Sequence, residues 1–312
     1  MEGRVGFFVT NLHGYHGKVL DEVRPEAERL GMQMEVFDAQ NNAIKQAKDL
    51  VSFAFAKTSG RECVFVVPEG DASYAGEIDH DPTLQQARRL LKKGIGYVLM
   101  NHGREEIIAT LRTEFPTLPV GIVAVDDAEF GRVQGRQVRA LLPNGGIVLC
   151  VLGNPFDSAS RDRSRALRQE LEGHGVTIEE VDGRWHDDHA FNAVHKWVIS
   201  PSRRNRPLDA VVAQNDYMGF GARRALLQAA EELGRDDLAT LPVLGGDGLP
   251  DVGIRWVEDG TLTATVKVTL PGRVCLDRVI RYWTEGTPFP PVTRLPVKSF
   301  PDEAILAKRA RP

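Results

Sequence analysis

The sequence predicts an α/β protein built from two doubly wound parallel sheets, and three observations lead to this prediction. Short apolar runs rich in β-branched residues alternate with longer amphipathic segments along the whole chain. The runs are almost continuously apolar, which is typical of parallel strands that helices cover on both faces. The chain has 312 residues, which exceeds the usual size of a single core, and the runs are too many for one open sheet of that length.

The predicted elements follow in a regular order. The strands are Val5–Thr10, Met34–Phe37, Cys63–Pro68, Gly96–Met100, Val120–Val125, Ile147–Leu152, Val176–Val181, Ala210–Gln214, Pro242–Gly245 and Leu262–Val268. The amphipathic helices between them include Lys18–Leu30, Leu84–Lys93, Phe130–Leu142, Arg161–Glu172 and Gly219–Leu233. Near the C-terminus, the four prolines of Pro288–Pro296 predict an extended crossing segment rather than a helix.

The composition excludes several classes of partner. The net charge is −4, and no basic block stands out beyond the short run Arg203–Arg206. We interpret this run as an exposed loop and expect no nucleic acid to bind this chain. No apolar stretch reaches the length of a membrane span. We also expect no cofactor and no metal.

The N-terminus and the cysteines give information on the cellular compartment of the protein. Met1–Arg4 leads directly into an apolar strand, without the basic, apolar and small-residue regions of a secretory signal. The protein is therefore either a mature chain whose leader has been removed or a cytosolic protein. Cys63 and Cys150 lie in strand-like runs and Cys275 in a helical pattern, which predicts three reduced core thiols.

Polar and aromatic residues follow most of the predicted strands. Ligands of open α/β sheets collect at the carboxyl ends of strands, so these residues form the candidate site. They are Asn11, His13, Tyr15, His16, Glu69, Asp71, Asn101, His102, Asp126, Asp127, Asn154, Asp157, Ser160, Arg161, Gln214, Asn215, Asp216 and Asp247. Carboxylates, amides and an arginine suit the hydroxyls of a neutral polyol, and an aromatic face suits the apolar side of a sugar ring. The sequence therefore predicts binding of a small polar solute.

Several segments occur together in a characteristic order. They are Met32–Val36 after Leu30-Gly31, Asp38–Asn42, Asp126-Asp127 with Phe130-Gly131 and Gly135, Ser158–Arg165, Val211–Ala222 and Leu244–Gly248. This set resembles the type I periplasmic sugar-binding proteins, above all the ribose-binding kind, which are related to the ligand-binding core of lac repressor family regulators. The resemblance covers roughly residues 5 to 297.

The resemblance implies the type I periplasmic binding protein fold, in which a three-crossover hinge joins two similar lobes. The N-terminal lobe would comprise residues 1–125 plus 269–290, and the C-terminal lobe residues 126–268 plus 291–312. Such a protein is not an enzyme. It captures a small ligand, here most simply a monosaccharide, in the interlobe cleft by hinge closure, and delivers it for ABC-type sugar uptake.

The resemblance also implies roles for three residues of the C-terminal lobe. Asn215 and Asp247 match positions that hydrogen-bond sugar hydroxyls, and Arg161 matches an arginine that contacts the ring or the anomeric oxygen. We therefore expect these three side chains to bind the ligand.

The N-terminal lobe departs from the family pattern. Tyr15 and His16 stand where ribose binders carry two stacking aromatics, and His13 stands where they carry an asparagine. Asn101 replaces a frequent aspartate, and His102 replaces an arginine. These exchanges remove formal charge from the lobe's contacts, so the ligand is expected to be a different sugar, a polyol or a nucleoside-like molecule.

Enzymatic alternatives have weaker support. A nicotinamide-dependent enzyme would need a glycine-rich turn, but Gly219-Phe220-Gly221 is followed by Arg224 where the third glycine belongs. Asp126 and Asp127 could form a catalytic carboxylate pair, although capping of the next helix by one and a place in the hinge for the other is the simpler interpretation. No Gly-x-Ser-x-Gly motif occurs.

A second enzymatic alternative is a metal-dependent hydrolase. Its ligands would come from one polar cluster, His186, Asp187, Asp188, His189 and His195. Polar residues at the start of a helix usually serve as caps and as solvated surface. Trp185, just before them, is either a core residue or a contact at the edge of the site.

Two binding roles stay open. The chain is either a transport receptor that presents its closed form to a membrane permease in the periplasm, or the sensor part of a transcriptional regulator or receptor kinase system. Only four residues precede the first strand, which leaves no room for a DNA-binding domain and argues against a full-length repressor. The transport role predicts a monomer, and the sensor role is compatible with a cytoplasmic protein.

Overall fold

The computed structural model describes residues 3–56, 60–69, 78–101 and 103–310, and these form two compact units. Unit 1 comprises Met1–Val125 and Leu270–Leu295, and unit 2 comprises Asp126–Thr269 and Pro296–Pro312. The expected lobe boundaries differ from these at Thr269 and at residues 291–295. The second difference arises because β11 (Val292–Leu295) pairs in parallel with β5 (Val120–Val125) and so completes the sheet of unit 1.

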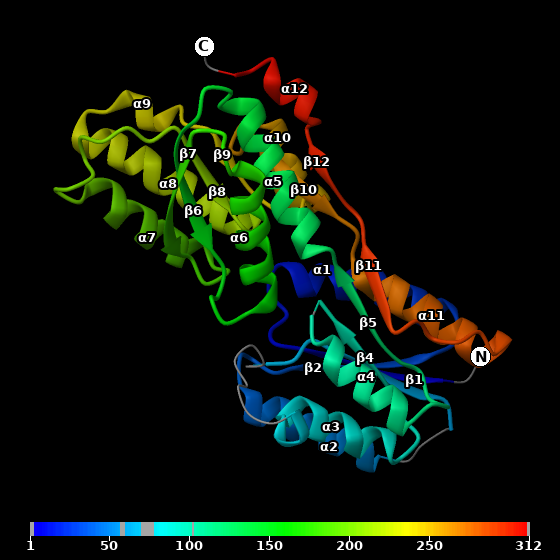
Figure 1. The fold of residues 1–312 in the computed structure, drawn as a ribbon. Helices are drawn as coiled ribbons and strands as arrows, with labels where there is room; N and C mark the ends of the chain where they lie inside the picture. Colours follow the sequence, from blue (N-terminus) through cyan, green and yellow to red (C-terminus); the bar gives the residue numbers. More distant parts are fainter. Residues whose placement is uncertain (1–2, 57–59, 70–77, 102, 311–312) are drawn as a thin grey trace. The chain divides into compact units, whose positions relative to one another are not determined.

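Unit 1 is a six-stranded parallel sheet with helices on both faces (Figure 1). Its strands β1 (Arg4–Val9), β2 (Gln33–Asp38), β3 (Glu62–Val66), β4 (Gly96–Met100), β5 and β11 lie in the order β11-β5-β4-β3-β1-β2. The helices are α1 (Tyr15–Arg29), α2 (Ala43–Phe55), α3 (Pro82–Leu91), α4 (Glu105–Glu114) and α11 (Pro271–Glu285), with a short 3₁₀ turn at Ile78–His80.

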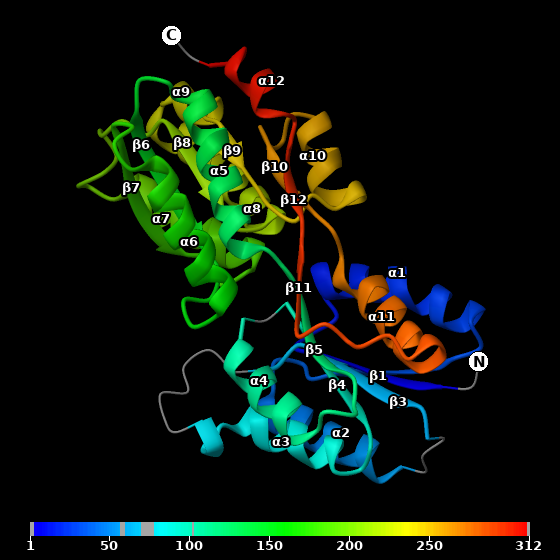
Figure 2. The same ribbon diagram turned by 45° about the vertical axis from the view of Figure 1, so that its right-hand side comes forward.

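The two faces of this sheet follow from the alternation of side chains along a strand. Phe7 and Phe65 point to the face that α1 and α11 cover. Phe8 and Val64, each one residue away, point to the face that α2, α3 and α4 cover. Figure 2 shows the two sets of helices on opposite sides of the sheet. Because alternate side chains of each strand face one helix layer or the other, most positions are apolar, and the strands form nearly continuous apolar runs in the sequence.

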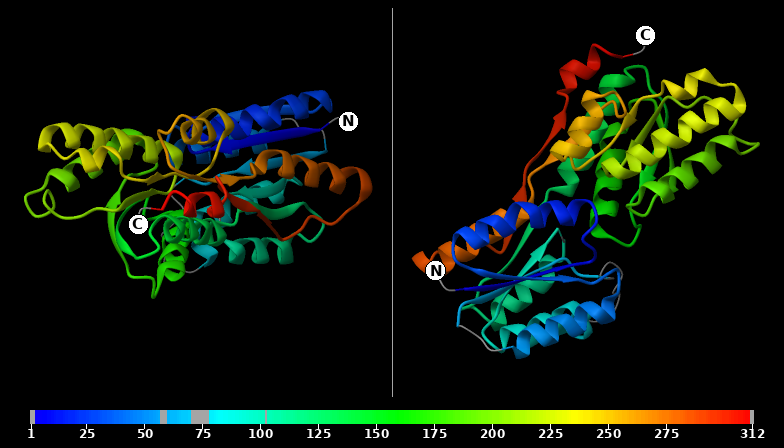
Figure 3. Two further views of the ribbon diagram at one scale, coloured as in Figure 1. Left: turned by 90° about the horizontal axis from the view of Figure 1, so that it is seen from above. Right: turned by 180° about the vertical axis from the view of Figure 1, so that it is seen from behind.

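Unit 2 repeats this architecture with four parallel strands, β6 (Gly146–Leu152), β7 (Val176–Asp182), β8 (Ala210–Ala213) and β9 (Val243–Leu244), in the order β7-β6-β8-β9. Helices α5 (Asp127–Leu141) and α6 (Ser158–Leu171) cover one face, and α7 (Asp187–Ile199) and α8 (Asp216–Leu233) cover the other, where they lie side by side (Figure 3).

Smaller elements complete unit 2. Strand β10 (Thr265–Val268) pairs antiparallel with β12 (Val297–Phe300). The short helices are α9 (Asp236–Ala239), α10 (Arg255–Glu258), which continues a π-type turn at Pro250–Ile254, and α12 (Glu303–Ala307). None of the helices in the described ranges is both long enough and apolar enough to cross a membrane.

Most predicted elements are present, including the ten strands, and two of the strands, β4 and β5, have the predicted bounds. The extended character of Pro288–Pro296 is also correct, but part of it is strand β11, and neither β11 nor β12 was predicted as a strand. Cys63, Cys150 and Cys275 are buried free thiols, as expected. Burial raises the pKa of Cys150 to about 12, which keeps this thiol protonated.

Helices α5 and α6 pack closely because Gly131 lies at their contact. A Cβ atom on Gly131 would come within 2.2 Å of the main-chain oxygen of Arg163. We expect Gly131→Ala to lower the free energy of unfolding by about 1–3 kcal/mol, because overpacking forces the two helices apart. Urea denaturation measures this change.

Gly234→Ala provides the control for this prediction. Gly234 ends α8 with a φ of 61°, and a Cβ atom at this position would have no other atom within 4 Å. Its replacement should cost only the backbone strain, about 1 kcal/mol. A Gly131→Ala protein as stable as the wild type would show that the two helices do not depend on this close approach.

Candidate functional site

The polar loops of unit 2 that follow β6, β7 and β8 are joined by hydrogen bonds. Strands β6, β7, β8 and β9 are all parallel, so their carboxyl ends lie along one edge of the sheet. The Asn215 amide nitrogen donates to the main-chain oxygen of Trp185 at 3.1 Å. The Trp185 indole nitrogen in turn donates to Asp157 Oδ2 at 2.6 Å. These contacts fix a continuous polar edge.

Asn215 has a structural role at this edge. It is the N-cap of α8, and its Oδ1 accepts a hydrogen bond from the main-chain N–H of Met218 at 2.7 Å. An amide side chain has two acceptor lone pairs and two N–H donors, and the two contacts of Asn215 use one of each. The cap therefore orients the side chain and leaves part of its hydrogen-bonding capacity for a ligand.

Asp247 follows β9, and its carboxyl group has a raised pKa. Its side chain is almost fully buried, and its Oδ1 lies 3.7 Å from Arg163 Nη1. Burial raises the pKa of Asp247 to about 6, and the charge of Asp127 adds to this, against the effect of Arg163. Its backbone has a φ of 86°, an unusual value for any residue other than glycine.

Asp216 lies beneath the loop that carries Asp247. Its carboxyl oxygens accept hydrogen bonds from the Thr265 hydroxyl at 2.6 Å and from the main-chain N–H of Gly248 at 2.9 Å. Burial, and then the charge of Asp247, raise the pKa of Asp216 well above its usual value. Asp216, one of the strand-end residues of the candidate site, therefore anchors the Asp247 loop from inside unit 2.

Arg163 is the central cation of this edge, and the sequence analysis did not identify it. Its Nε donates to Asp127 Oδ1 at 2.8 Å, and its Nη1 donates to the main-chain oxygen of Gln214 at 2.6 Å. Its guanidinium also stacks on Phe130, 3.7 Å from the ring centroid. One signal was available: Arg163 stands on the face of α6 that otherwise carries core residues such as Leu167, where an unpaired arginine would be costly.

Arg161, the predicted contact, lies elsewhere on α6. It is exposed, and its Nη1 donates to the main-chain oxygen of Phe156 at 2.6 Å. Its charge lowers the pKa of Asp157, although burial has the larger effect and raises it. The structure therefore places Arg161 near the outer end of the polar edge, next to Asp157, and places Arg163 at its buried centre.

Trp185 belongs to the core of unit 2 and also contacts two residues of the polar edge. Its ring packs against the core between the sheet and α7 and α8, and it covers Gly153, where a Cβ atom would come within 2.2 Å of the indole. The φ of Trp185 is 66°, which is rare for a bulky residue. Its contacts with Asp157 and Asn215 hold this conformation. An aromatic side chain therefore forms part of the polar edge.

In unit 1, three of the predicted residues, His13, Tyr15 and His16, lie where β1 leads into α1. Tyr15 is the first residue of α1, and its ring lies edge-on to His16 with 5.7 Å between centroids. His16 Nδ1 lies 3.2 Å from the main-chain oxygen of Asn11. Burial lowers the pKa of His16 to about 4, so its ring is neutral at pH 7. His13 is exposed, and its main-chain N–H donates to Asn11 Oδ1 at 3.1 Å.

Asn101 ends β4 in a left-handed conformation with a φ of 50°. The main-chain N–H of Asn101 donates to the main-chain oxygen of Val123 at 3.1 Å. Its Oδ1 is buried, and the described part of the chain offers this atom no hydrogen-bond partner. Such an acceptor is costly unless a ligand or water satisfies it. His102, the neighbouring predicted residue, lies outside the described residues.

Three residues of the enzymatic alternatives, Asp126, Asp127 and His195, have partners within unit 2. Asp126 caps α5, with its Oδ1 accepting from the main-chain N–H of Glu129 at 2.8 Å, while Asp127 binds Arg163. His195 Nε2 lies 3.0 Å from Glu232 Oε2 on the neighbouring helix α8. Within the described ranges, no group of three or more His, Cys, Asp and Glu side chains could hold a metal ion.

We expect Asp247→Asn to make the protein more stable at neutral pH. The folded-state pKa of Asp247, about 6, lies above its ordinary value of 3.8, so its contribution is fully present below pH 4 and is lost as the pH rises through 6. Asparagine does not ionise, so the variant does not lose stability as the pH rises, and asparagine tolerates the positive φ. The gain should be on the order of 3 kcal/mol above pH 6 and should vanish near pH 4.

Urea denaturation at about pH 4 and about pH 8 checks this prediction. Asp188→Asn is the control, because the Asp188 side chain is 80% exposed and should change stability little at either pH. An Asp247→Asn protein that is less stable than the wild type at pH 8 would contradict the prediction.

Several known proteins are similar to this chain in sequence or in fold. Residues 5–270 match the family described as periplasmic binding protein domain. The ribose import binding protein of Salmonella typhimurium is 26% identical over 255 residues, which cover 81% of this chain and 74% of that protein. The xylitol-binding protein of Mycolicibacterium smegmatis is 26% identical over 264 residues, which cover 84% and 66%. The crystal structure of a Caulobacter myo-inositol binding protein superposes with a TM-score of 0.76 at 22% identity, covering 98% of this chain and 95% of the other.

Proposed function

Because the chain belongs to the periplasmic binding protein domain family, whose members bind solutes without transforming them, we propose that it captures a neutral monosaccharide or polyol for uptake by an ABC-type membrane permease. The observation that carries this proposal is the polar edge of unit 2, where Asp157, Trp185 and Asn215 are linked and Asp247 lies beside Arg163. A periplasmic location and a monomeric state are part of the proposal.

The chemistry of this edge suits a polyhydroxylated ligand. Each hydroxyl donates one hydrogen bond and accepts others. The carboxylates of Asp247 and Asp157 accept from hydroxyls, whereas Arg161 and the free N–H of Asn215 donate to them. The face of the Trp185 indole covers the apolar side of the ligand. These roles for Arg161, Asn215 and Asp247 are those expected from the sequence. Arg163, 3.7 Å from Asp247, favours the charged form of that carboxyl against the effect of burial.

Unit 1 supplies the remaining contacts in this proposal. They come from His13, Tyr15, His16, Asn101 and His102. The neutral ring of His16 and the amide of Asn101 favour an uncharged ligand over an acidic one, because neither brings a cation to the site. Ligand binding to both units favours a closed state, with bending where the chain crosses between them at residues 125–126, 269–270 and 295–296.

The names of the similar proteins support the same ligand class. Ribose, xylitol and myo-inositol, which those proteins are named for or bound to, are all uncharged and rich in hydroxyl groups. An uncharged pentose, hexose or polyol is therefore the ligand that we propose for this chain.

A thermal-shift screen tests the proposal. The purified chain is heated with pentoses, hexoses, linear polyols, inositols and nucleosides, and with glucuronate and amino acids as charged controls. A ligand at 100 times its dissociation constant adds about 2.7 kcal/mol of stability, which raises the melting temperature by several degrees. We expect a clear shift with one neutral compound and none with the charged controls. Equal shifts with glucuronate, or no shift with any sugar or polyol, would overturn the proposal.

A further inference from the structure

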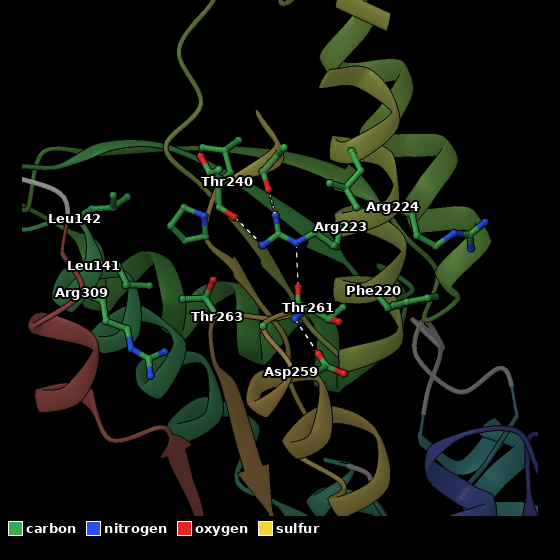
Figure 4. Close-up of a pocket in the computed structure, with 15 residues that line it drawn as sticks. Leu141, Leu142, Phe220, Arg223, Arg224, Thr240, Asp259, Thr261, Thr263 and Arg309 are labelled. Atoms are coloured by element: carbon green, nitrogen blue, oxygen red, sulfur yellow. Dashed lines mark hydrogen bonds between the residues drawn. The ribbon is translucent and has the colours of Figure 1, made fainter. Parts of the chain in front are cut away.

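Unit 2 contains a cavity of about 620 Å³ at the other end of its sheet (Figure 4). Thr240, Leu241 and Pro242, which line it, directly precede β9, whereas Asp247 follows β9. The cavity is therefore at the amino ends of the strands and is separate from the polar edge at their carboxyl ends. Helix α8 provides another wall with Phe220, Arg223 and Leu227.

Arg223 gives this cavity its chemical character. Its guanidinium donates to the main-chain oxygens of Leu241 at 2.8 Å, Thr261 at 3.0 Å and Ala239 at 3.1 Å. These bonds use three of its five N–H groups. Burial lowers the pKa of Arg223, and no carboxylate among the described residues pairs with it. A partly buried cation is thus held by carbonyl dipoles, without a counter-charge.

The other charges around the cavity do not neutralise Arg223. Asp259 Oδ1 accepts from the main-chain N–H of Thr261 at 2.9 Å. Arg224 lies 3.3 Å from Asp188 on α7, and Figure 4 shows its guanidinium turned away from Thr240. Arg309, which is exposed and follows α12, also lines the cavity and adds a further positive charge (Figure 4). The lining therefore has an excess of positive charge.

We propose that this cavity is a second ligand site, which binds a small organic anion. One carboxylate or phosphate group binds the free N–H groups of Arg223 with support from Arg309, since the planar guanidinium suits both groups. The apolar body of the ligand lies against Leu141, Phe220 and Leu227, which line the same cavity. The cavity has the size of small-molecule sites in proteins, and the bound anion supplies the counter-charge that Arg223 lacks.

Isothermal titration calorimetry of the full chain tests this proposal with three probes of similar shape. Benzoate represents carboxylates, phenyl phosphate represents phosphates, and benzyl alcohol is the neutral control. We expect at least one of the anions to bind, the alcohol not to bind, and the affinity to fall as salt is added. The tighter anion identifies the class of the natural ligand. Failure of both anions to bind at millimolar concentration, or equal binding of the alcohol, would overturn the proposal.

Variants locate the binding. Arg223→Gln should weaken anion binding about tenfold, as expected for loss of one charge-assisted hydrogen bond. Because Arg223 also ties the segment before β9 to the turn at Thr261, a second pair of variants decides the question if this protein does not fold. Leu227 is 45% exposed, so Leu227→Glu brings a negative charge to the cavity without disturbing the core, and Leu227→Gln is its neutral match.

The expected pattern is that Leu227→Glu weakens anion binding, whereas Leu227→Gln and Asp247→Asn leave it unchanged. The Asp247→Asn control separates this site from the proposed sugar site, because binding of benzoate at the polar edge would respond to that charge. Anion affinity that is the same in Leu227→Glu and Leu227→Gln would place the anion elsewhere and reject the proposal.

Discussion

Replacing Asp247 with alanine is expected to cost about 2–4 kcal/mol of ligand-binding free energy, which is about a 30- to 700-fold loss of affinity. The carboxylate is buried next to Arg163, so the hydrogen bond that it accepts from a ligand hydroxyl is charge-assisted and shielded from water. Its loss also leaves that hydroxyl unpaired. Calorimetry with the compound found in the thermal-shift screen measures the change.

The matched variant is Asp247→Asn, because alanine adds strain at a φ of 86° and asparagine does not. Asparagine should still weaken binding, since it removes the charge, although it is expected to stabilise the protein at neutral pH. Lower affinity with higher stability is the typical result when a costly buried charge is kept for binding. Unchanged affinity in both variants would remove Asp247 from the ligand site.

Arg163→Ala is expected to lower the free energy of unfolding by about 3–5 kcal/mol, because it breaks a buried ion pair from one side. Asp127 loses its hydrogen bond at 2.8 Å to this arginine, the main-chain oxygen of Gln214 loses a donor, and Phe130 loses its stacked guanidinium. Asp247 also loses the cation that opposes the rise of its pKa. Urea denaturation at neutral pH measures the loss.

Arg161→Ala is the natural control, since this arginine is on the same helix but exposed. Its replacement should change stability by no more than about 0.5 kcal/mol and should weaken ligand binding instead. Adding Asp247→Asn to Arg163→Ala should restore part of the lost stability, because one of the two carboxylates that faced the arginine is then neutral. Similar losses of stability in the two arginine variants would contradict the difference in burial.

Much of the fold could be predicted because its signals are local. Strands β4 and β5 are apolar at every position that faces a helix layer, and each predicted bound matches the structure. The family resemblance rested on the order of such segments, and the match over residues 5–270 confirms it. Strands β11 and β12 escaped prediction because they are four residues long and follow prolines. Their extended conformation depends on the partners β5 and β10.

The candidate site was also predictable in part. The sequence by itself determined which loops carry polar residues, since a strand end is visible as the end of an apolar run. It could not determine which polar group is buried. Arg161 and Arg163 are two residues apart, and each residue turns a helix by about 100°, so the two side chains leave α6 on nearly opposite sides.

Only the tertiary structure decides which of those sides faces the sheet, and so which arginine lies beside Asp247 and opposes the rise of its pKa. The same holds for Arg223, whose three carbonyl partners come from loops up to 38 residues away in the sequence. Burial and charge pairing arise from contacts between distant segments, and no local pattern of residues encodes them.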